Sequence, residues 1–226
     1  MQDFVHLHVH SQYSLLDGQA SIPRLVDKAI ADGMRGIAVT DHGNMFAIKE
    51  FWNYVKKKNG ARKDKIKELK GKIDTLQAEI NDTDSPTEEQ TANLAKLKAE
   101  LDGVPKEDFK AIIGCEVYVA RRGSMLLKED KRDQSGYHLI LLAKNKIGYH
   151  NLIKIVSKAW TDGYYMRPRT DRHELEKYHE GLICCSACLG GEVPKHITNG
   201  DLAAAEETVQ WYKNLFGEDY YLELQL

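Results

Sequence analysis

Long apolar runs are missing from this chain. None of its 226 residues lies in a stretch near the roughly 18 consecutive apolar residues that a membrane-spanning helix requires, and Asp3 stands where a signal peptide would need a basic start. Cysteine is also scarce, because the 4 in the chain are too few and too clustered for a secreted disulfide framework. These absences predict a cytoplasmic protein with reduced thiols and no membrane partner.

An excess of charge of one sign is lacking as well. The chain carries 32 Lys and Arg against 34 Asp and Glu, a net charge of -2, so any contact with nucleic acid must be local. The glycine-rich loops that cradle nucleotide phosphates and the Gly-x-Ser-x-Gly turn of serine hydrolases are both absent. The overall composition, 42% hydrophobic and 29% charged, is typical of a globular protein. The length predicts one large domain or one domain with an appendage.

Short apolar segments alternate with amphipathic ones along most of the chain. In residues 22–33, Ile22, Val26 and Ile30 recur on one helical face, and Gly33 follows as a stop signal. The same patterns predict helices at 148–159 and 202–216, and strands at 4–9, 36–40, 111–120, 137–143, 181–186 and 220–224. This alternation predicts a largely parallel α/β architecture, either a doubly wound sheet or a barrel.

Residues 56–110 differ from the rest of the chain, because they hold much of its charge and almost none of its aromatic residues. Apolar residues within 61–102 step by three and four, which predicts an inserted helical hairpin with a narrow seam of Ile66, Leu69, Ile73, Leu76, Ile80, Leu94, Leu97 and Leu101. Lys56–Lys72 carries a net +7 and Ile73–Asp102 a net -6. The basic part could contact phosphate, but the opposite charges favour a self-paired, solvated hairpin.

Residues 4–10 read Phe-Val-His-Leu-His-Val-His. Side chains alternate between the faces of a strand, so His6, His8 and His10 would share one face. In an α/β barrel this face would look inward near the carboxyl end of the strand. Imidazoles gathered there predict metal ligands, and a hydrogen-bonded row of surface histidines is the alternative.

Two further predicted strands carry groups of the same chemistry. The strand at 36–40 runs directly into Asp41 and His42, at another carboxyl end. The strand at 111–120 carries Glu116 among apolar residues, where an unpaired carboxylate would be costly. A metal ion or a basic partner would remove that cost.

Two other residues extend this set. Cys188 lies just past the apolar segment 181–186, where it can face the same site, whereas Cys184 and Cys185 within the segment are expected to be buried. Asp17 is equally consistent with a ligand and with a turn residue. Histidines, carboxylates and one thiolate together predict a metallohydrolase with two or three divalent ions, which favours phosphoesters modestly over amides.

Five segments of the chain, in order, match a known pattern. They are Phe-Val-His-Leu-His-Val-His-Ser-Gln-Tyr-Ser-Leu-Leu-Asp-Gly at 4–18, Ala-Val-Thr-Asp-His-Gly-Asn-Met at 38–45, Gly-Cys-Glu-Val-Tyr at 114–118, Tyr-His-Leu-Ile-Leu-Leu-Ala-Lys-Asn at 137–145, and 181–191. They resemble the PHP (polymerase and histidinol phosphatase) domain family, most closely the form at the amino terminus of bacterial DNA polymerase III alpha subunits. The resemblance covers nearly the whole chain outside 56–110.

The resemblance implies a distorted (β/α)7 barrel of the TIM type over residues 1–226, with 56–110 as a helical-hairpin insertion. It implies two or three divalent ions, usually Zn²⁺ or Mn²⁺, bound by His8, His10, Asp17, His42, Glu116, His138 and Cys188. Glu116 would bridge ions, and Glu116, His42 and Asp17 would be catalytic. His6 becomes a structural residue. His138 opens its predicted strand instead of ending it, which the spacing does not explain.

Two departures from the family pattern affect the implied activity. The family completes its site with an Asp-x-His that does not occur before Leu226, so the chain is expected to be truncated at its carboxyl end, with low metal occupancy or activity. The polymerase palm, whose carboxylates would use Mg²⁺, is also absent. This piece is therefore not expected to polymerise DNA.

In relatives of this type the PHP domain is either a 3'-5' exonuclease that proofreads or a non-catalytic domain that stabilises the replicase and docks a separate exonuclease. The set of ligands present here favours the active form, with the DNA 3' end, the remaining polymerase domains and other replicase subunits as partners. A free-standing phosphatase for small phosphomonoesters is a third possibility. Arg167, Arg169 and Arg172, beside two tyrosines, would guide a DNA backbone, and a solvated loop is the equal alternative.

Overall fold

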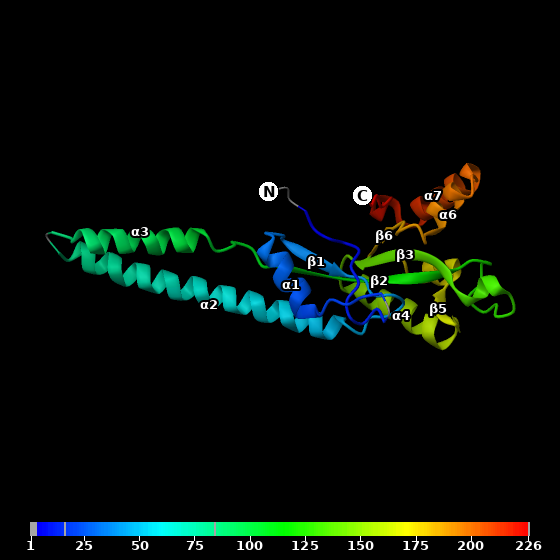
Figure 1. Cartoon of the computed structure of the whole chain (residues 1–226), viewed down its shortest axis with the longest axis horizontal. Coiled ribbons are helices and arrows are strands. Elements are labelled where there is room, and N and C mark those ends of the chain that lie inside the picture. The colour runs from blue at the N-terminus through cyan, green and yellow to red at the C-terminus, as the bar shows by residue number, and fades with distance from the viewer. Residues whose placement is uncertain (1–3, 16, 84, 226) are drawn as a thin grey trace.

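The computed structural model describes residues 4–15, 17–83 and 85–225. Figure 1 shows a body in which helices pack on a sheet, and an arm of two long helices, α2 (Ile48–Asn81) and α3 (Glu88–Asp102), that extends from one side of the body. The candidate site lies in the body, at the ends of strands of this sheet.

Within the described residues, seven strands form one sheet in the order β4-β5-β2-β3-β6-β7, with β1 paired to β2. Their bounds are β1 Gly36–Val39, β2 Lys110–Ala120, β3 Gly136–Ala143, β4 Tyr164–Tyr165, β5 Arg167–Thr170, β6 Leu182–Cys185 and β7 Tyr220–Tyr221. β2 is parallel to β1 and β5, and β6 to β7, but β3 is antiparallel to both β2 and β6. The sheet is mixed, and the expectation of a largely parallel sheet is wrong for β3.

The direction of β3 follows from the connection that precedes it. Residues 121–135 join β2 to β3 and contain a short 3₁₀ turn, Lys131–Gln134, but no α-helix. A parallel partner would require the chain to return along the whole length of β2, which a crossover helix usually accomplishes. This loop stays at one end of the sheet instead. The start of β3 therefore lies beside the carboxyl end of β2, with His138 opposite Tyr118.

The remaining helices are α1 Ile22–Ala31, α4 Lys146–Thr161, α5 Arg172–Tyr178, α6 Glu192–Thr198 and α7 Leu202–Phe216. Asp201 caps α7 by accepting a hydrogen bond from the Ala204 N–H at 3.0 Å. The three predicted helices are present with ends within two residues, whereas α5, α6 and the β4–β5 hairpin were not predicted because such short elements show little periodicity. No helix in the described part of the chain is long and apolar enough to cross a membrane.

Two apolar cores hold the strands that carry the site. Leu141, Leu152 and Ile155 are fully buried where β3 packs on α4. Val26 and Phe51 belong to a second core, which joins α1 and the first turns of α2 to β1. Burying each such side chain is worth about 1.5–3 kcal/mol. The strand ends beyond these cores are thereby fixed relative to one another.

The predicted strand at 4–9 is not a regular strand. The segment makes two backbone hydrogen bonds to the region of β1, from Ala38 N–H to the His6 carbonyl at 2.9 Å and from Thr40 N–H to the Val9 carbonyl at 2.8 Å. Leu7 is 42% exposed, so the expected apolar face is incomplete. The prediction is wrong because alternation in the sequence sets the direction of side chains, whereas a strand also needs continuous pairing with a neighbour.

The predicted hairpin of helices is present as the arm. Leu69 is buried, and the other predicted seam residues are partly buried, namely Ile66, Ile73, Leu76, Ile80, Leu94, Leu97 and Leu101. Thr87 and Gln90 form a capping box at the start of α3. α2 runs without a break from the body into the arm, so it begins earlier than residue 61. The limits 56–110 for an insertion stay a prediction.

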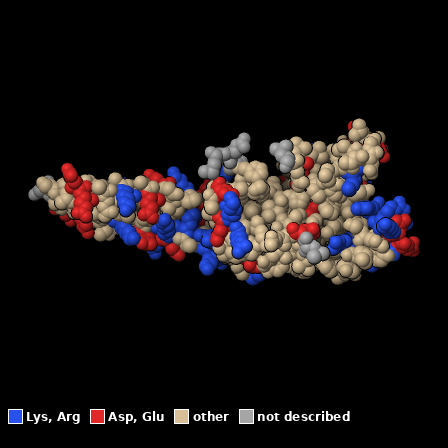
Figure 2. Space-filling model, viewed as in Figure 1, with Lys and Arg blue, Asp and Glu red and all other residues tan. Residues whose placement is uncertain are grey.

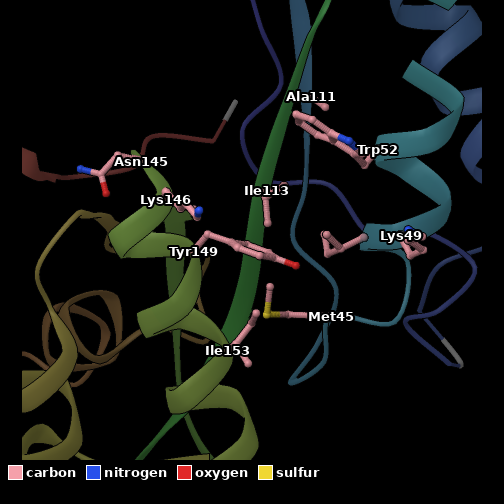
Figure 3. A pocket seen from close by; sticks show the side chains of 11 residues that line it. Met45, Lys49, Trp52, Ala111, Ile113, Asn145, Lys146, Tyr149 and Ile153 are labelled. Carbon is pink, nitrogen blue, oxygen red and sulfur yellow. The ribbon is translucent and has the colours of Figure 1, made fainter. Parts of the chain in front are cut away.

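The outer face of β2 is open between α2 and α4, because no helix follows β2 to cover it. A groove of about 750 Å³ lies there. Figure 3 shows Trp52 on α2 and Tyr149 and Ile153 on α4 facing it from opposite sides, together with Lys49. None of the predicted metal ligands lines this groove, so it is separate from the candidate site.

Candidate metal centre

Polar groups converge at the edge of the sheet where β1, β2 and β6 end and β3 begins. Glu116 lies in β2, His42 follows β1 and Cys188 follows β6. His138 joins them from the start of β3 because β3 is antiparallel to its neighbours. Strand direction thus accounts for the position of His138, which the sequence spacing left unexplained.

The carboxylate of Glu116 is the centre of this group, which is called the Glu116 cluster below. Glu116 has no exposed surface. Its Oε2 lies 3.3 Å from His8 Nε2 and 3.0 Å from His10 Nε2. The same oxygen lies 3.0 Å from His42 Nδ1, and Oε1 lies 2.8 Å from His138 Nδ1. Four imidazoles around one buried carboxylate are a donor set typical of divalent transition metals.

The cluster contains two candidate ligand sets that share Glu116. They are His8, His10 and Glu116, and His42, Glu116 and His138, and within each set the ligand atoms lie within 4.8 Å of one another. In the described part of the chain, His42 Nδ1 and Glu116 Oε2 are buried and lie 3.0 Å apart, but neither makes a hydrogen bond of good geometry. Buried polar atoms are nearly always partnered, and a metal ion would satisfy both of these facing atoms. The residues therefore fit divalent metal binding.

A thiol extends the cluster beside His138. Cys188 Sγ lies 3.5 Å from His138 Nδ1 and 3.7 Å from Glu116 Oε1, and the Gly190 N–H donates to this sulfur at 3.4 Å. A Cβ atom at position 190 would lie 2.7 Å from His138 Nδ1, so only glycine lets this loop approach the ring. The two cysteines of β6 are buried, as predicted.

Asp41 belongs to neither candidate ligand set and instead joins the segments that carry them. Its buried carboxylate accepts hydrogen bonds from the N–H and Oγ of Ser11, at 2.7 and 2.8 Å, and from Ser14 Oγ at 2.9 Å. Ser14 Oγ in turn accepts the His42 N–H at 3.0 Å and lies 3.2 Å from His10 Nδ1. This network ties the segment that carries His10 to the loop that carries His42.

Asp17 lies at the edge of the cluster. Its Oδ2 is 3.5 Å from His42 Nε2, and its side chain is 56% exposed. It belongs to neither ligand set, although it faces the ring nitrogen of His42 that points away from Glu116. The ring of Tyr118 stacks on His42 with centroids 5.7 Å apart, so this imidazole is held between polar and aromatic neighbours.

Glu223 is a site residue that the sequence patterns did not reveal. Its Oε1 lies 2.7 Å from His8 Nδ1, and its backbone N–H donates to Ser186 Oγ at 2.9 Å. A carboxylate on one ring nitrogen fixes the tautomer and aims the other nitrogen, here toward Glu116. The sequence feature that could have identified Glu223 is its position just past β7, because His42 and Cys188 also follow the carboxyl ends of strands.

The carboxylates and imidazoles shift one another's protonation. Burial acts to lower the pKa of His8, but contacts with Glu116 and Glu223 outweigh burial and raise that pKa to about 10. Burial also opposes protonation of His138, yet the neighbouring thiol and Glu116 raise its pKa to about 9. Burial alone would raise the pKa of Glu116, and the surrounding imidazoles hold it well below its usual range instead. Burial lowers the pKa of His42.

Arg169, one of the three arginines predicted to guide DNA, is fully buried. Its guanidinium donates hydrogen bonds to the carbonyls of Gly163, Met125 and Leu127, at 3.1, 2.7 and 3.0 Å. A side chain in this position has no surface to offer a phosphate. The sequence pattern could not show this, because basic residues in a loop look alike whether they face solvent or carbonyls.

The other two arginines differ from each other. Arg172 contacts Glu192 at 3.1 Å and lies over the ring of Trp211, 4.6 Å from its centroid. Arg167 is exposed, and no acidic side chain of the described residues forms an ion pair with it. Arg167 is therefore the one whose charge is open to a ligand.

Comparison with known proteins identifies the family of this chain. The family model of the PHP domain matches residues 6–226. The chain is 39% identical over 222 residues to the DNA polymerase III subunit alpha of Borreliella burgdorferi, and 38% over 223 residues to that of Treponema pallidum. The corresponding protein of Aquifex aeolicus is 34% identical over 229 residues. These alignments cover 98% or 99% of this chain but only 15% or 16% of each relative.

Proposed function

The chain belongs to the PHP domain family, and from this premise we propose that it is the amino-terminal PHP segment of a bacterial DNA polymerase III alpha subunit. Relatives of that name match nearly its whole length. The sheet and its helices are then part of a distorted (β/α)7 barrel, with 56–110 as an insertion. The protein is cytoplasmic, and its partners are the DNA 3' end, the remaining polymerase domains and other replicase subunits.

The proposed activity is a metal-dependent 3'-5' exonuclease that hydrolyses the terminal phosphodiester of DNA. The observation that supports it is the sharing of one buried carboxylate, Glu116, by two ligand sets. Two or three Zn²⁺ or Mn²⁺ ions bound there would lower the pKa of water and neutralise charge on the phosphate. Mg²⁺ would serve the polymerase module, which is not part of this chain.

The residues of the Glu116 cluster have different proposed roles in metal binding and catalysis. Glu116 would be shared by two ions, and the other residues that would hold the ions are His8 and His10, Asp17 and His42, and His138 and Cys188. Glu116, His42 and Asp17 are the catalytic groups. Arg167 offers its guanidinium to the DNA backbone, and contacts of this kind position a strand without reading its sequence.

The activity is testable with an oligonucleotide labelled at its 5' end. After metal loading, a longer polymerase that contains this chain should shorten the oligonucleotide stepwise from the 3' end, and a chelator should stop the reaction. A 3'-blocked oligonucleotide should remain intact. If protein with measured metal content leaves free 3' ends intact, the exonuclease proposal fails. Cleavage of a chromogenic phosphomonoester without action on DNA would indicate a phosphatase instead.

Metal binding should release protons, because His8 and His138, with pKa values of about 10 and 9, are protonated at neutral pH while ligation requires neutral imidazole. Both pKa values are raised, so competition by protons is strongest below them and weakens as pH rises through 9 to 10. The apparent affinity for Mn²⁺ should therefore increase with pH. Calorimetry in buffers of different ionisation enthalpy measures the proton release, which His8→Gln should reduce by about one proton.

A further inference from the structure

Lysines form two rows along α2. The first, called the open row, consists of Lys49, Lys56, Lys63, Lys67 and Lys70, and the second, called the paired row, consists of Lys58, Lys65 and Lys72. Neighbours within the rows are three, four or seven residues apart, which is close to one or two helical turns, so each row keeps to one side of the helix. The two rows therefore offer a comparison within one element.

The paired row is neutralised. Lys58 contacts Asp27 at 2.7 Å, and Lys65 contacts Glu100 of α3 at 3.0 Å. Lys72 forms an ion pair with Glu68, one turn earlier in α2. This row contributes to the packing of the arm against itself and against α1, as the opposite charges of the two halves of the hairpin predict.

The open row is different, because its charges are exposed and largely unmatched. Among the described residues, only Lys63 of this row has an acidic contact, with Asp108 at 2.7 Å. Lys67 lies four residues after Lys63 and three before Lys70, and like charges at these spacings destabilise a helix. A row of like charges in which only Lys63 has an acidic contact among the described residues suits a ligand of opposite charge.

The geometry of the open row suits an extended, rigid polyanion. At a rise of 1.5 Å per residue, Lys49 and Lys70 are about 32 Å apart along α2, close to the roughly 34–36 Å of one turn of B-form DNA. α3 packs along the outer part of α2, so the helix that carries the open row is straight and is supported along its length by a second helix (Figure 1). Figure 2 shows charged side chains of both signs spaced along the arm, whereas the middle of the molecule is largely uncharged on this face.

The row also begins on the body. Lys49 lies in the first turn of α2, beside the groove between α2 and α4 (Figure 3), whereas Lys67 and Lys70 lie on the arm. A ligand along the whole row would contact both parts of the molecule. An acidic peptide would need its own rigid repeat to match this length, while a DNA duplex has one already.

We propose that the open row binds the phosphate backbone of double-stranded DNA over about one helical turn. This proposed surface is separate from the exonuclease site and needs no metal. It depends on the proposed function only in that DNA is taken as the ligand. Its function would be to hold a duplex along the outside of the molecule. The contacts are to phosphates alone, so binding would be independent of sequence and strongly dependent on salt.

The test compares two triple variants of the 226-residue chain that lose the same charge. One is Lys56→Gln, Lys67→Gln and Lys70→Gln in the open row, and the matched control is Lys58→Gln, Lys65→Gln and Lys72→Gln in the paired row. Binding of a fluorescent 20-base-pair duplex is measured by anisotropy in EDTA over a range of salt concentrations. Circular dichroism melting verifies that both variants are folded.

The open-row variant should bind at least about tenfold more weakly and lose about 3 units from the slope of log affinity against log salt, since each phosphate contact contributes about 0.9. The paired-row variant should lose much less. Equal losses in both variants, or no loss in the first, would overturn the proposal. If polyglutamate competes as well as unlabelled duplex does, the open row would be assigned to an acidic protein ligand, and the proposal would also be overturned.

The two proposals fail separately in these assays. A protein that binds the duplex in EDTA through the open row but never shortens a 3' end would contradict only the exonuclease. A protein that shortens 3' ends while its open-row variant binds duplex normally would contradict only this inference.

Discussion

Glu116→Gln is expected to remove metal binding and, with it, release of nucleotides from the DNA 3' end. Glu116 contributes to both candidate ligand sets, and glutamine keeps its size while losing the charge and one ligand oxygen. Loss of a residue that only supports a metal ligand typically costs 10- to 100-fold in affinity or activity. Loss of the shared ligand should cost more than about 100-fold. Elemental analysis and the 5'-labelled oligonucleotide assay measure the two effects.

Glu174→Gln is the matched control for this change. Glu174 is also a buried carboxylate, but it contacts Lys158 at 3.1 Å and lies outside the Glu116 cluster. The control should keep its metal and its activity. Should Glu116→Gln retain wild-type metal content and 3' release, the cluster is not the centre of the chemistry.

Arg169→Ala is expected to destabilise the protein by about 4 kcal/mol. The change removes the guanidinium that serves three backbone carbonyls, and each buried acceptor left unsatisfied costs about 1–3 kcal/mol. For a chain of this length about 1 kcal/mol corresponds to roughly 2–4 °C in Tm, so Tm should fall by about 10 °C. Chemical denaturation gives the free energy of unfolding and scanning calorimetry gives Tm.

Arg167→Ala, two residues away, supplies the comparison. Arg167 is exposed and carries none of these hydrogen bonds, so its loss should change stability by less than about 0.5 kcal/mol. It should instead weaken capture of a DNA 3' end, without a change in Tm. Equal stability of the two variants would show that the buried guanidinium does not hold the β4–β5 region in place.

Several features of the site were predictable from local pattern. The alternation in residues 4–10 correctly places His8 and His10 on one side, toward Glu116, but His6 is exposed against Phe4, because the segment is not a regular strand. Glu116 was singled out because a carboxylate in an apolar strand needs a partner. The spacing of apolar residues in 61–102 likewise predicted the seam of the arm, since a helix places residues three and four apart on one face.

Other features depend on contacts between distant segments. Asp41 and His42 are adjacent and equally polar, yet Asp41 binds two serines while His42 faces Glu116. Glu223 meets His8 only because β7 pairs with β6 at the same edge of the sheet. No local period contains that information.

Local sequence pattern therefore indicated several of the side chains that gather around Glu116, and for His8 and His10 the side of their segment on which they lie, because periodicity and burial are properties of short stretches. The tertiary structure decided which segments are neighbours and in what direction they run. The antiparallel course of β3 brings His138 to Glu116, and the packing of the β4–β5 hairpin turns Arg169 inward. Strand pairing joins segments that are far apart in the sequence, so it is visible only in the folded chain.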